Sequence, residues 1–184
     1  MTVSEILDLY DKNKAFYGKG GITVTGGEPL VQIDFVIALF AEAKKRKIHT
    51  CLDTSGVTFQ PDNQENRIKF NRLAEVTDLV LLDIKHIDPE EHIKLTSQPN
   101  NNILAFARYL DEKQVPVWIR HVIVPGITYE QTALYRLGQF LGTLTNVKAL
   151  DILPYHDMGK MKYENMGLDY ALKDVKPLSN QEAH

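Results

Sequence analysis

Five short apolar segments recur at near-regular intervals along this chain, and each is followed by a stretch with helical periodicity. The segments start near residues 22, 49, 78, 116 and 147, so that successive starts lie 27, 29, 38 and 31 residues apart. A strand, its crossover helix and the two connecting loops together need about 30 residues. The spacing therefore predicts an α/β fold in which helices connect parallel strands.

The individual elements follow from residue periodicity and from turn residues. The expected strands are a β-branched run that starts at residue 21 and is closed by glycines, then 49–56, 78–85, 115–125 and 147–153. The expected helices are 2–17, with Thr2 and Glu5 as a capping box, then 30–47, a short helix within 86–100, 65–75, 101–113, and one opened by Thr128 and Gln131 that runs to Leu144. Periodicity is lost after Pro154.

Apolar runs at 79–82 and 115–119 do not alternate with polar residues. Such runs are typical of strands that helices bury on both faces, and an open or partial barrel fits them best. The chain has 184 residues, of which 43% are hydrophobic, so we expect one compact domain over 1–184.

Composition excludes several classes of function. The net charge is -3, and no basic stripe is present that could neutralise phosphates, so we expect no nucleic-acid partner. No apolar run approaches the ~20 residues needed to span a bilayer, and we expect no membrane association and a cytoplasmic location. The chain has a single cysteine, Cys51, which rules out an internal disulfide framework and a site built from several of its own thiolates.

Each expected strand ends in polar residues of the kinds used in catalysis. These are Glu28, Asp53 with Thr54, Asp83 with Lys85, Arg120 with His121, and His156. The carboxyl ends of parallel strands form the active face of α/β proteins. One such residue alone could equally cap a helix or lie on the surface, but capping does not call for lysine, arginine or histidine at these points. Five such strand ends together favour a ligand site.

Residues 20–29, Gly-Gly-Ile-Thr-Val-Thr-Gly-Gly-Glu-Pro, carry the most specific signal. Glycines let the backbone approach a ligand closely, and Glu28 offers an acceptor for a cationic amine. The same letters would also suit an ordinary turn into a helix, with Pro29 at its first position.

Several motifs in order resemble one family. The segment 23–29 is similar to the glycine-glycine-glutamate motif of radical S-adenosylmethionine enzymes, and the segments 52–56, 81–86, 118–126 and 152–159 look like the branch that activates pyruvate formate-lyase. The match covers almost the whole chain. It implies a partial parallel (β/α) barrel of the radical S-adenosylmethionine type, here missing its first strand and cluster loop.

The resemblance also implies roles for individual residues. Gly26, Gly27 and Glu28 would hold the methionyl amino group, while Lys85 and His156 would contact S-adenosylmethionine elsewhere. Asp53, Thr54 and Asp83 would hold a monovalent cation beside the cofactor carboxylate. Arg120 would contact the protein substrate.

In the family, S-adenosylmethionine is cleaved reductively at a [4Fe-4S] cluster, and the resulting radical abstracts hydrogen from a glycine Cα. The implied protein substrate is pyruvate formate-lyase, and the implied electron donor is a flavodoxin or ferredoxin. The cofactor carries the radical chemistry and the protein positions it.

One departure bears on activity. The family binds its cluster through Cys-x3-Cys-x2-Cys upstream of the glycine-glycine-glutamate motif, and none of these three ligands is present here. Cys51 lies inside an expected strand and is better interpreted as a small buried hydrophobe. We therefore expect the chain to be shortened at both ends, of modest stability because of an exposed sheet edge, and inactive alone.

Three other interpretations stay open. Asp83, Lys85 and Asp88 resemble the Asp-x-Lys-x-x-Asp array of orotidine-phosphate decarboxylase-type barrels, although no phosphate site accompanies them. The chain could be a non-catalytic fragment that binds formate-lyase or S-adenosylmethionine. It could also be half of a split enzyme whose partner pairs with the open sheet edge.

Overall fold

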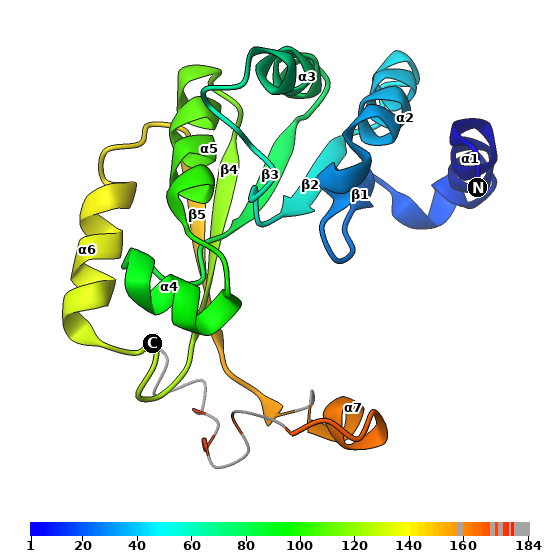
Figure 1. Ribbon diagram of the computed structural model, residues 1–184. Helices are drawn as coiled ribbons and strands as arrows, with labels where there is room; N and C mark the ends of the chain where they lie inside the picture. The colour runs from blue at the N-terminus through cyan, green and yellow to red at the C-terminus, as the bar shows by residue number, and fades with distance from the viewer. Residues whose placement is uncertain (158–159, 170–171, 173–174, 177, 179–184) are drawn as a thin grey trace.

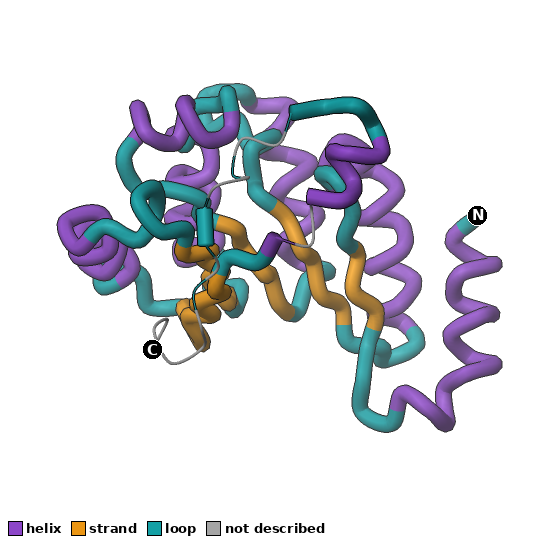
Figure 2. Tube along the Cα trace, turned by 90° about the horizontal axis from the view of Figure 1, so that it is seen from below, coloured by secondary structure: helices purple, strands orange, loops and turns teal. Residues whose placement is uncertain are grey.

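A single five-stranded parallel sheet organises the computed structural model of this chain, with strand order β1-β2-β3-β4-β5. The structure describes residues 1–157, 160–169, 172, 175–176 and 178. Because each strand pairs with the next one along the chain, crossovers of the usual right-handed kind place their helices on the same face of the sheet. Figures 1 and 2 show this arrangement, with α2, α3, α5 and α6 along one side of the strands. The predicted α/β class and partial barrel are confirmed.

The elements lie close to their predicted positions. The strands are β1 (Ile22–Val24), β2 (Thr50–Thr54), β3 (Leu79–Asp83), β4 (Val117–Ile123) and β5 (Val147–Pro154). The helices are α1 (Val3–Tyr17), α2 (Ile33–Lys45), α3 (Gln64–Glu75), α4 (Pro89–Thr96), α5 (Asn101–Glu112), α6 (Gln131–Leu141) and α7 (Lys160–Asn165), with a 3-10 turn η1 (Pro29–Gln32) ahead of α2. The helix α7 falls where sequence periodicity indicated none.

Side-chain caps mark the starts of several helices, among them α1, α3, α4 and α6. The predicted capping box of α1 is present, since Thr2 accepts from the backbone of Glu5 and the Glu5 side chain accepts from the backbone of Thr2. The predicted cap of α6 is wrong. Glu130 caps this helix by accepting from two backbone amides, while the Thr128 hydroxyl instead bonds to the backbone on either side of Ile123. Thr128 is drawn into the bend after β4, where it satisfies buried backbone groups.

The two faces of the sheet differ in burial, which corrects the expectation that helices bury both. Along β4 buried and less buried residues alternate, and Trp118 remains 43% exposed while its neighbours Val117 and Ile119 are almost fully buried. In a strand, successive side chains point to opposite faces. The helix-covered face therefore holds the core, and the other face carries Trp118, Asp53, Asp83 and Arg120.

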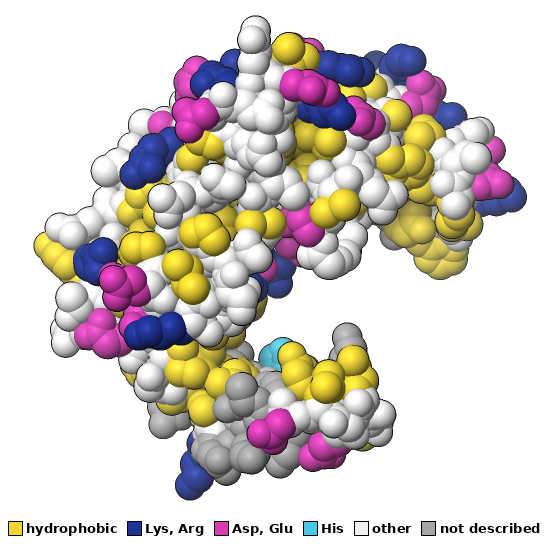
Figure 3. All heavy atoms as spheres, viewed as in Figure 1, with side chains coloured by type: hydrophobic (Ala, Val, Ile, Leu, Met, Phe, Trp, Pro, Cys, Tyr) yellow, Lys and Arg dark blue, Asp and Glu magenta, His cyan; other side chains and the backbone are white. Residues whose placement is uncertain are grey.

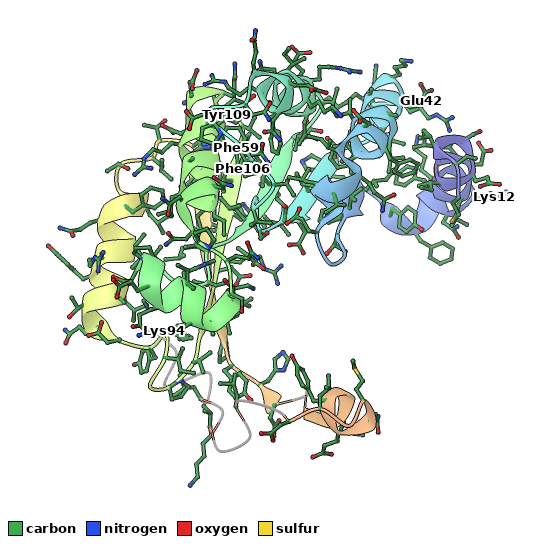
Figure 4. All side chains as sticks on the ribbon, in the orientation of Figure 1. Lys12, Glu42, Phe59, Lys94, Phe106 and Tyr109 are labelled. Atoms are coloured by element: carbon green, nitrogen blue, oxygen red, sulfur yellow. The ribbon has the colours of Figure 1, made fainter. Side chains whose placement is uncertain are left out.

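An aromatic cluster fastens α3 and α5 to the loop that follows β2. The ring centroid of Phe59 lies 4.9 Å from that of Phe70, 5.5 Å from Phe106 and 4.9 Å from Tyr109. Figure 4 shows Phe59, Phe106 and Tyr109 grouped beside α5. Burial raises the pKa of Tyr109 to about 12, so its hydroxyl stays protonated and donates to Asn71. The cluster holds the loop after β2 against the helical layer.

Helix α1 lies at the β1 side of the molecule and packs against α2 (Figure 1). Arg46 at the end of α2 pairs with Asp11 of α1 at 2.7 Å. Within the part of the chain that the structure describes, no helix is both long enough and apolar enough to span a bilayer.

We predict that Gly56→Ala destabilises the fold by about 2 kcal/mol or more, combining left-handed backbone strain with overpacking. Gly56 has φ +72, and an added Cβ would lie 2.5 Å from a Phe106 ring carbon. Urea unfolding followed by circular dichroism measures the loss.

Gly126→Ala is the matched control, because Gly126 has φ +73 with nothing within 4 Å of an added Cβ. It should cost only the backbone strain, about 1 kcal/mol. Equal losses in the two variants would contradict the packing assigned to Gly56.

A pH dependence is expected from Asp111 at the end of α5. Its Oδ1 accepts from the backbone amides of Thr145 and Asn146 and from the Thr145 hydroxyl, and the Thr145 amide is the main reason that the pKa of Asp111 lies below its usual value. Because the folded pKa is lowered, this contribution is present above the unfolded pKa of about 3.9 and is lost as pH falls through the folded value.

Asp111→Asn should therefore lower the urea midpoint at pH 7, and its difference from the unaltered chain should shrink as the pH is lowered below about 4. The exposed Asp62, changed to Asn, is the control and should leave the midpoint unchanged at both pH values. A difference that grows in acid would contradict the role given to Asp111.

Candidate active site

The carboxyl ends of β1 to β4 bring the predicted site residues to one edge of the sheet. Register places Asp53 opposite Leu81 and Asp83 opposite Arg120, and Arg120 is opposite Asp151 on β5. Figure 3 shows a hollow beneath this region, between the body of the domain and the segment that carries α7. The convergence expected from parallel strands is therefore present.

Glu28 is the most heavily bonded side chain at this edge. Its Oε1 accepts from the Thr54 hydroxyl at 2.5 Å and from the Leu30 amide at 3.1 Å. Its Oε2 accepts from the Ser55 hydroxyl at 2.6 Å and from the Ser55 amide at 3.1 Å. The carboxylate thus ties the turn after β1 to the end of β2 and also caps η1.

Thr54 belongs with Glu28 rather than with the neighbouring carboxylate. The Thr54 side chain lies in the buried layer, donates to Glu28 and accepts from the amide of Gly56 at 2.9 Å. Asp53 precedes it in β2, and alternation along a strand sends the two side chains to opposite faces. The Thr54 hydroxyl is therefore committed to Glu28, which leaves the backbone carbonyl as the oxygen of Thr54 that could face a cation.

Asp53 forms an ion pair across the sheet. Arg120 Nη1 lies 3.1 Å from Asp53 Oδ1 and 3.0 Å from Oδ2, so that the guanidinium of β4 reaches over β3 to the end of β2. Thr25 donates to the same carboxylate at 3.3 Å. Arg120 Nε is also 3.9 Å from Asp151 on β5. These contacts partly neutralise the charge of Asp53 and hold the Arg120 side chain along the face of the sheet that the helices leave uncovered.

A second pair lies at the end of β3. Lys85 Nζ is 2.7 Å from Asp83 Oδ2, and both side chains are partly exposed. Among the described residues, no three His, Cys, Asp or Glu side chains gather closely enough to hold a metal ion. The proposed cation ligands Asp53 and Asp83 are each paired with a basic side chain in this structure.

The end of β5 supplies His156, which is exposed, directly after the buried Tyr155. The rest of the motif at 152–159 includes Met158 and Gly159, which lie outside the described residues. His121, which the sequence grouped with Arg120, faces the other side of the sheet. It is buried, its Nδ1 lies 2.7 Å from the Ile84 carbonyl oxygen, and burial lowers its pKa.

The glycines ahead of Glu28 leave space for a ligand. Gly26 has φ +152, and nothing lies within 4 Å of a Cβ added at Gly26 or Gly27. Both are exposed. An amine acceptor beside open backbone, and the cation Lys85 at a nearby strand end, suit the amino acid moiety of S-adenosylmethionine.

The residues do not suit an iron–sulfur cluster. Cys51 is buried within β2, and burial raises the pKa of its thiol, which opposes the thiolate form that iron requires. It is the single cysteine of the sequence, and a cluster needs three or four thiolates. Any cluster ligands must come from polypeptide outside these 184 residues.

The contacts of Asp88 argue against a decarboxylase-like array formed by Asp83, Lys85 and Asp88. Its Oδ1 caps α4 by accepting from Glu90 and Glu91 amides, and its Oδ2 pairs with Arg136 at 3.0 Å. Both oxygens are therefore used within the helical layer, and the bond with Arg136 is the main cause of its lowered pKa. This structural role accounts for Asp88 without a catalytic one.

Sequence reasoning missed Ser55, which supplies two of the four hydrogen bonds to Glu28. The two residues are 27 positions apart, and a serine after a strand is an ordinary turn residue. A small hydroxyl side chain in the Asp-Thr-Ser-Gly run was the available signal.

Known proteins resemble this chain over most of its length. Residues 1–137 match the Radical SAM superfamily. The pyruvate formate-lyase-activating enzyme of Staphylococcus epidermidis is 47% identical over 179 residues, covering 96% of this chain and 71% of that protein. The enzyme of the same name from Staphylococcus aureus strain USA300 is 46% identical over 178 residues, covering 96% of this chain and 70% of that protein.

Solved structures agree in fold. A domain of pyruvate-formate lyase-activating enzyme from Bacteroides vulgatus has a TM-score of 0.68 at 24% identity, covering 88% of this chain and 87% of that one. Streptococcus suis SuiB bound to its precursor peptide SuiA has a TM-score of 0.69 at 17% identity, covering 95% of this chain and 37% of that one. Together with the sequence matches, the sheet and the Gly-Gly-Glu turn show that this chain belongs to the radical SAM superfamily, within the family of pyruvate formate-lyase-activating enzymes.

Proposed function

We propose that this chain binds S-adenosylmethionine at the carboxyl ends of its strands, as the cofactor-binding part of a glycyl-radical activating enzyme. The observation that carries the proposal is the Glu28 carboxylate, held by four hydrogen bonds beside the open backbone of Gly26 and Gly27. When bound, S-adenosylmethionine supplies the radical chemistry, and the chain supplies orientation and charge.

The site residues divide by the part of the cofactor that each would meet. Glu28, with the backbone of Gly26 and Gly27, accepts from the amino group. Lys85 offers a positive charge to the carboxylate, and His156 donates toward the ribose or the carboxylate. Lys85 can exchange its bond with Asp83 for the cofactor carboxylate, because the Lys85 side chain is 37% exposed.

Asp53, Asp83 and Thr54 are the proposed oxygen ligands of a monovalent cation, Thr54 through its carbonyl. Asp53 and Arg120 pair with each other in this structure, and the proposal gives them different roles: Asp53 binds the cation and Arg120 contacts the protein substrate. A cation beside Asp53 would compete with Arg120 for the carboxylate, and Arg120 would then be free to meet the protein substrate.

The proposed partner is a glycyl-radical enzyme, pyruvate formate-lyase, and the proposed electron donor is a flavodoxin or ferredoxin. Support comes from the names of the Staphylococcus relatives at 46–47% identity. Activation of that partner requires a cluster whose ligands this chain does not contain, so no reaction step is assigned to the chain by itself.

A second candidate follows from the single cysteine. Acting alone, the chain is a binding module for S-adenosylmethionine or for the glycyl-radical enzyme, or one half of a split activating enzyme. In the described sheet β1 is an edge strand that pairs with β2 on one side, and the other side of an edge strand can pair with another polypeptide.

We predict that Glu28→Gln weakens binding of S-adenosylmethionine by on the order of tenfold, because the amide lacks the charge that strengthens a hydrogen bond to an amine. Lys85→Met, which keeps the stem and removes the charge, should weaken binding by a similar factor. Isothermal titration calorimetry gives the dissociation constants, and urea midpoints show that each variant is folded.

Glu42→Gln is the matched control. Glu42 lies on α2, away from the strand ends, and pairs with Lys45 (Figure 4). It should bind as the unaltered chain does. If Glu28→Gln and Lys85→Met bind S-adenosylmethionine as tightly as the unaltered chain does, or if the unaltered chain does not bind it, the proposed site is wrong.

We also predict that the chain, after anaerobic treatment with iron and sulfide and desalting, retains less than one iron per protein and generates no glycyl radical on pyruvate formate-lyase. Iron analysis and electron paramagnetic resonance measure the two results. Cys51→Ser should leave the iron content unchanged. A stoichiometric cluster that is lost in Cys51→Ser would show that the buried thiol does bind iron.

A further inference from the structure

The Glu28 carboxylate has no spare acceptor position in this structure. A carboxylate offers about four lone-pair sites, and Glu28 receives four donors, two at each oxygen. An amino group that binds Glu28 must therefore replace one of these donors. Which donor leaves decides how much of the network survives cofactor binding.

Two of the donors are backbone amides. The Leu30 amide lies in η1, and the Ser55 amide lies directly after β2. A backbone donor can leave only if the chain moves, which would unsettle the cap of η1 or the bend that leads to Gly56. Both amides are therefore fixed partners of the carboxylate.

The Thr54 hydroxyl is also fixed. Thr54 is 3% exposed, and its oxygen accepts from the Gly56 amide at 2.9 Å while its proton is donated to Glu28. If it rotated, Glu28 Oε1 and the Gly56 amide would both lose a partner. Its β-branched side chain is also restricted at χ1.

The Ser55 hydroxyl is the donor that can leave. Ser55 is half-buried, its side chain turns about a single torsion, and its other contact is a long one, 3.4 Å from the Val57 amide to its oxygen. When it rotates, water can satisfy it, and the Ser55 amide still holds Glu28 Oε2 at 3.1 Å.

We infer that the Ser55 hydroxyl is a displaceable partner of Glu28, which fills the position of the cofactor amino group until S-adenosylmethionine binds and thereby sets the affinity for that amino group. The inference rests on the proposed function, because it assigns the amino group of S-adenosylmethionine to Glu28. It makes Ser55 a residue that tunes specificity by competing with the ligand, without touching the reacting atoms.

The test compares S-adenosylmethionine with the analogue in which hydrogen replaces the α-amino group. The dissociation constant of the analogue divided by that of S-adenosylmethionine reports the contribution of the amino group alone. A general disturbance of the site weakens both ligands together and leaves this ratio unchanged. Calorimetry gives this ratio for the unaltered chain and for Ser55→Ala, Ser55→Thr and Ser4→Ala. Ser4 is an exposed serine on α1 and serves as the distant control.

Removal of the competing hydroxyl should raise the ratio in Ser55→Ala by about tenfold, the effect of one hydrogen bond to a charged group. Ser55→Thr keeps a competing hydroxyl and should therefore not raise the ratio, and Ser4→Ala should retain the original ratio. A ratio that falls in Ser55→Ala would show that Ser55 positions Glu28, and an unchanged ratio would show that another donor leaves. Either result overturns the inference while the proposed cofactor site stands. A ratio near one in both the unaltered chain and Ser55→Ala overturns the amino contact at Glu28 and the inference with it.

Discussion

The handedness of the connections between parallel strands is the constraint on which this structure depends. Each strand pairs in parallel with its sequence neighbour, so all carboxyl ends lie at one edge, and right-handed crossovers place the connecting helices on one face. The covered face becomes the core. The other face is left to Asp53, Asp83, Arg120 and Trp118, and the edge gathers Glu28, Lys85 and Ser55 from separate parts of the sequence.

At that edge, charged groups are neutralised by one another. Asp53 pairs with Arg120 and Asp83 pairs with Lys85, while Glu28 is surrounded by neutral donors. A partly exposed pair is a weak interaction in water, so its members can be exchanged for a ligand at little cost. Glu28 differs because backbone amides fix it in place. The site thus combines one rigid acceptor with several charges that can be redirected.

The single, buried cysteine means that this chain has the fold of its family without the several thiolates that a cluster needs. Cys51 is buried within β2, and burial raises the pKa of its thiol. The residues that we propose to orient S-adenosylmethionine are in these 184 residues, whereas several thiolates for a cluster are not. The proposed binding of the cofactor therefore does not depend on the thiolates that radical generation needs.

Sequence periodicity by itself determined the α/β class, the positions of the five strands and the residues at their ends, because period and spacing are local properties of the chain. It also determined the capping box at Thr2 and the Gly-Gly-Glu turn. Tertiary structure decided which residues meet: Ser55 joins Glu28, Thr54 turns away from Asp53, and Thr128 fills a bend instead of capping α6. These outcomes depend on pairing between segments many residues apart and on which face each side chain occupies, and neither can be read from local sequence.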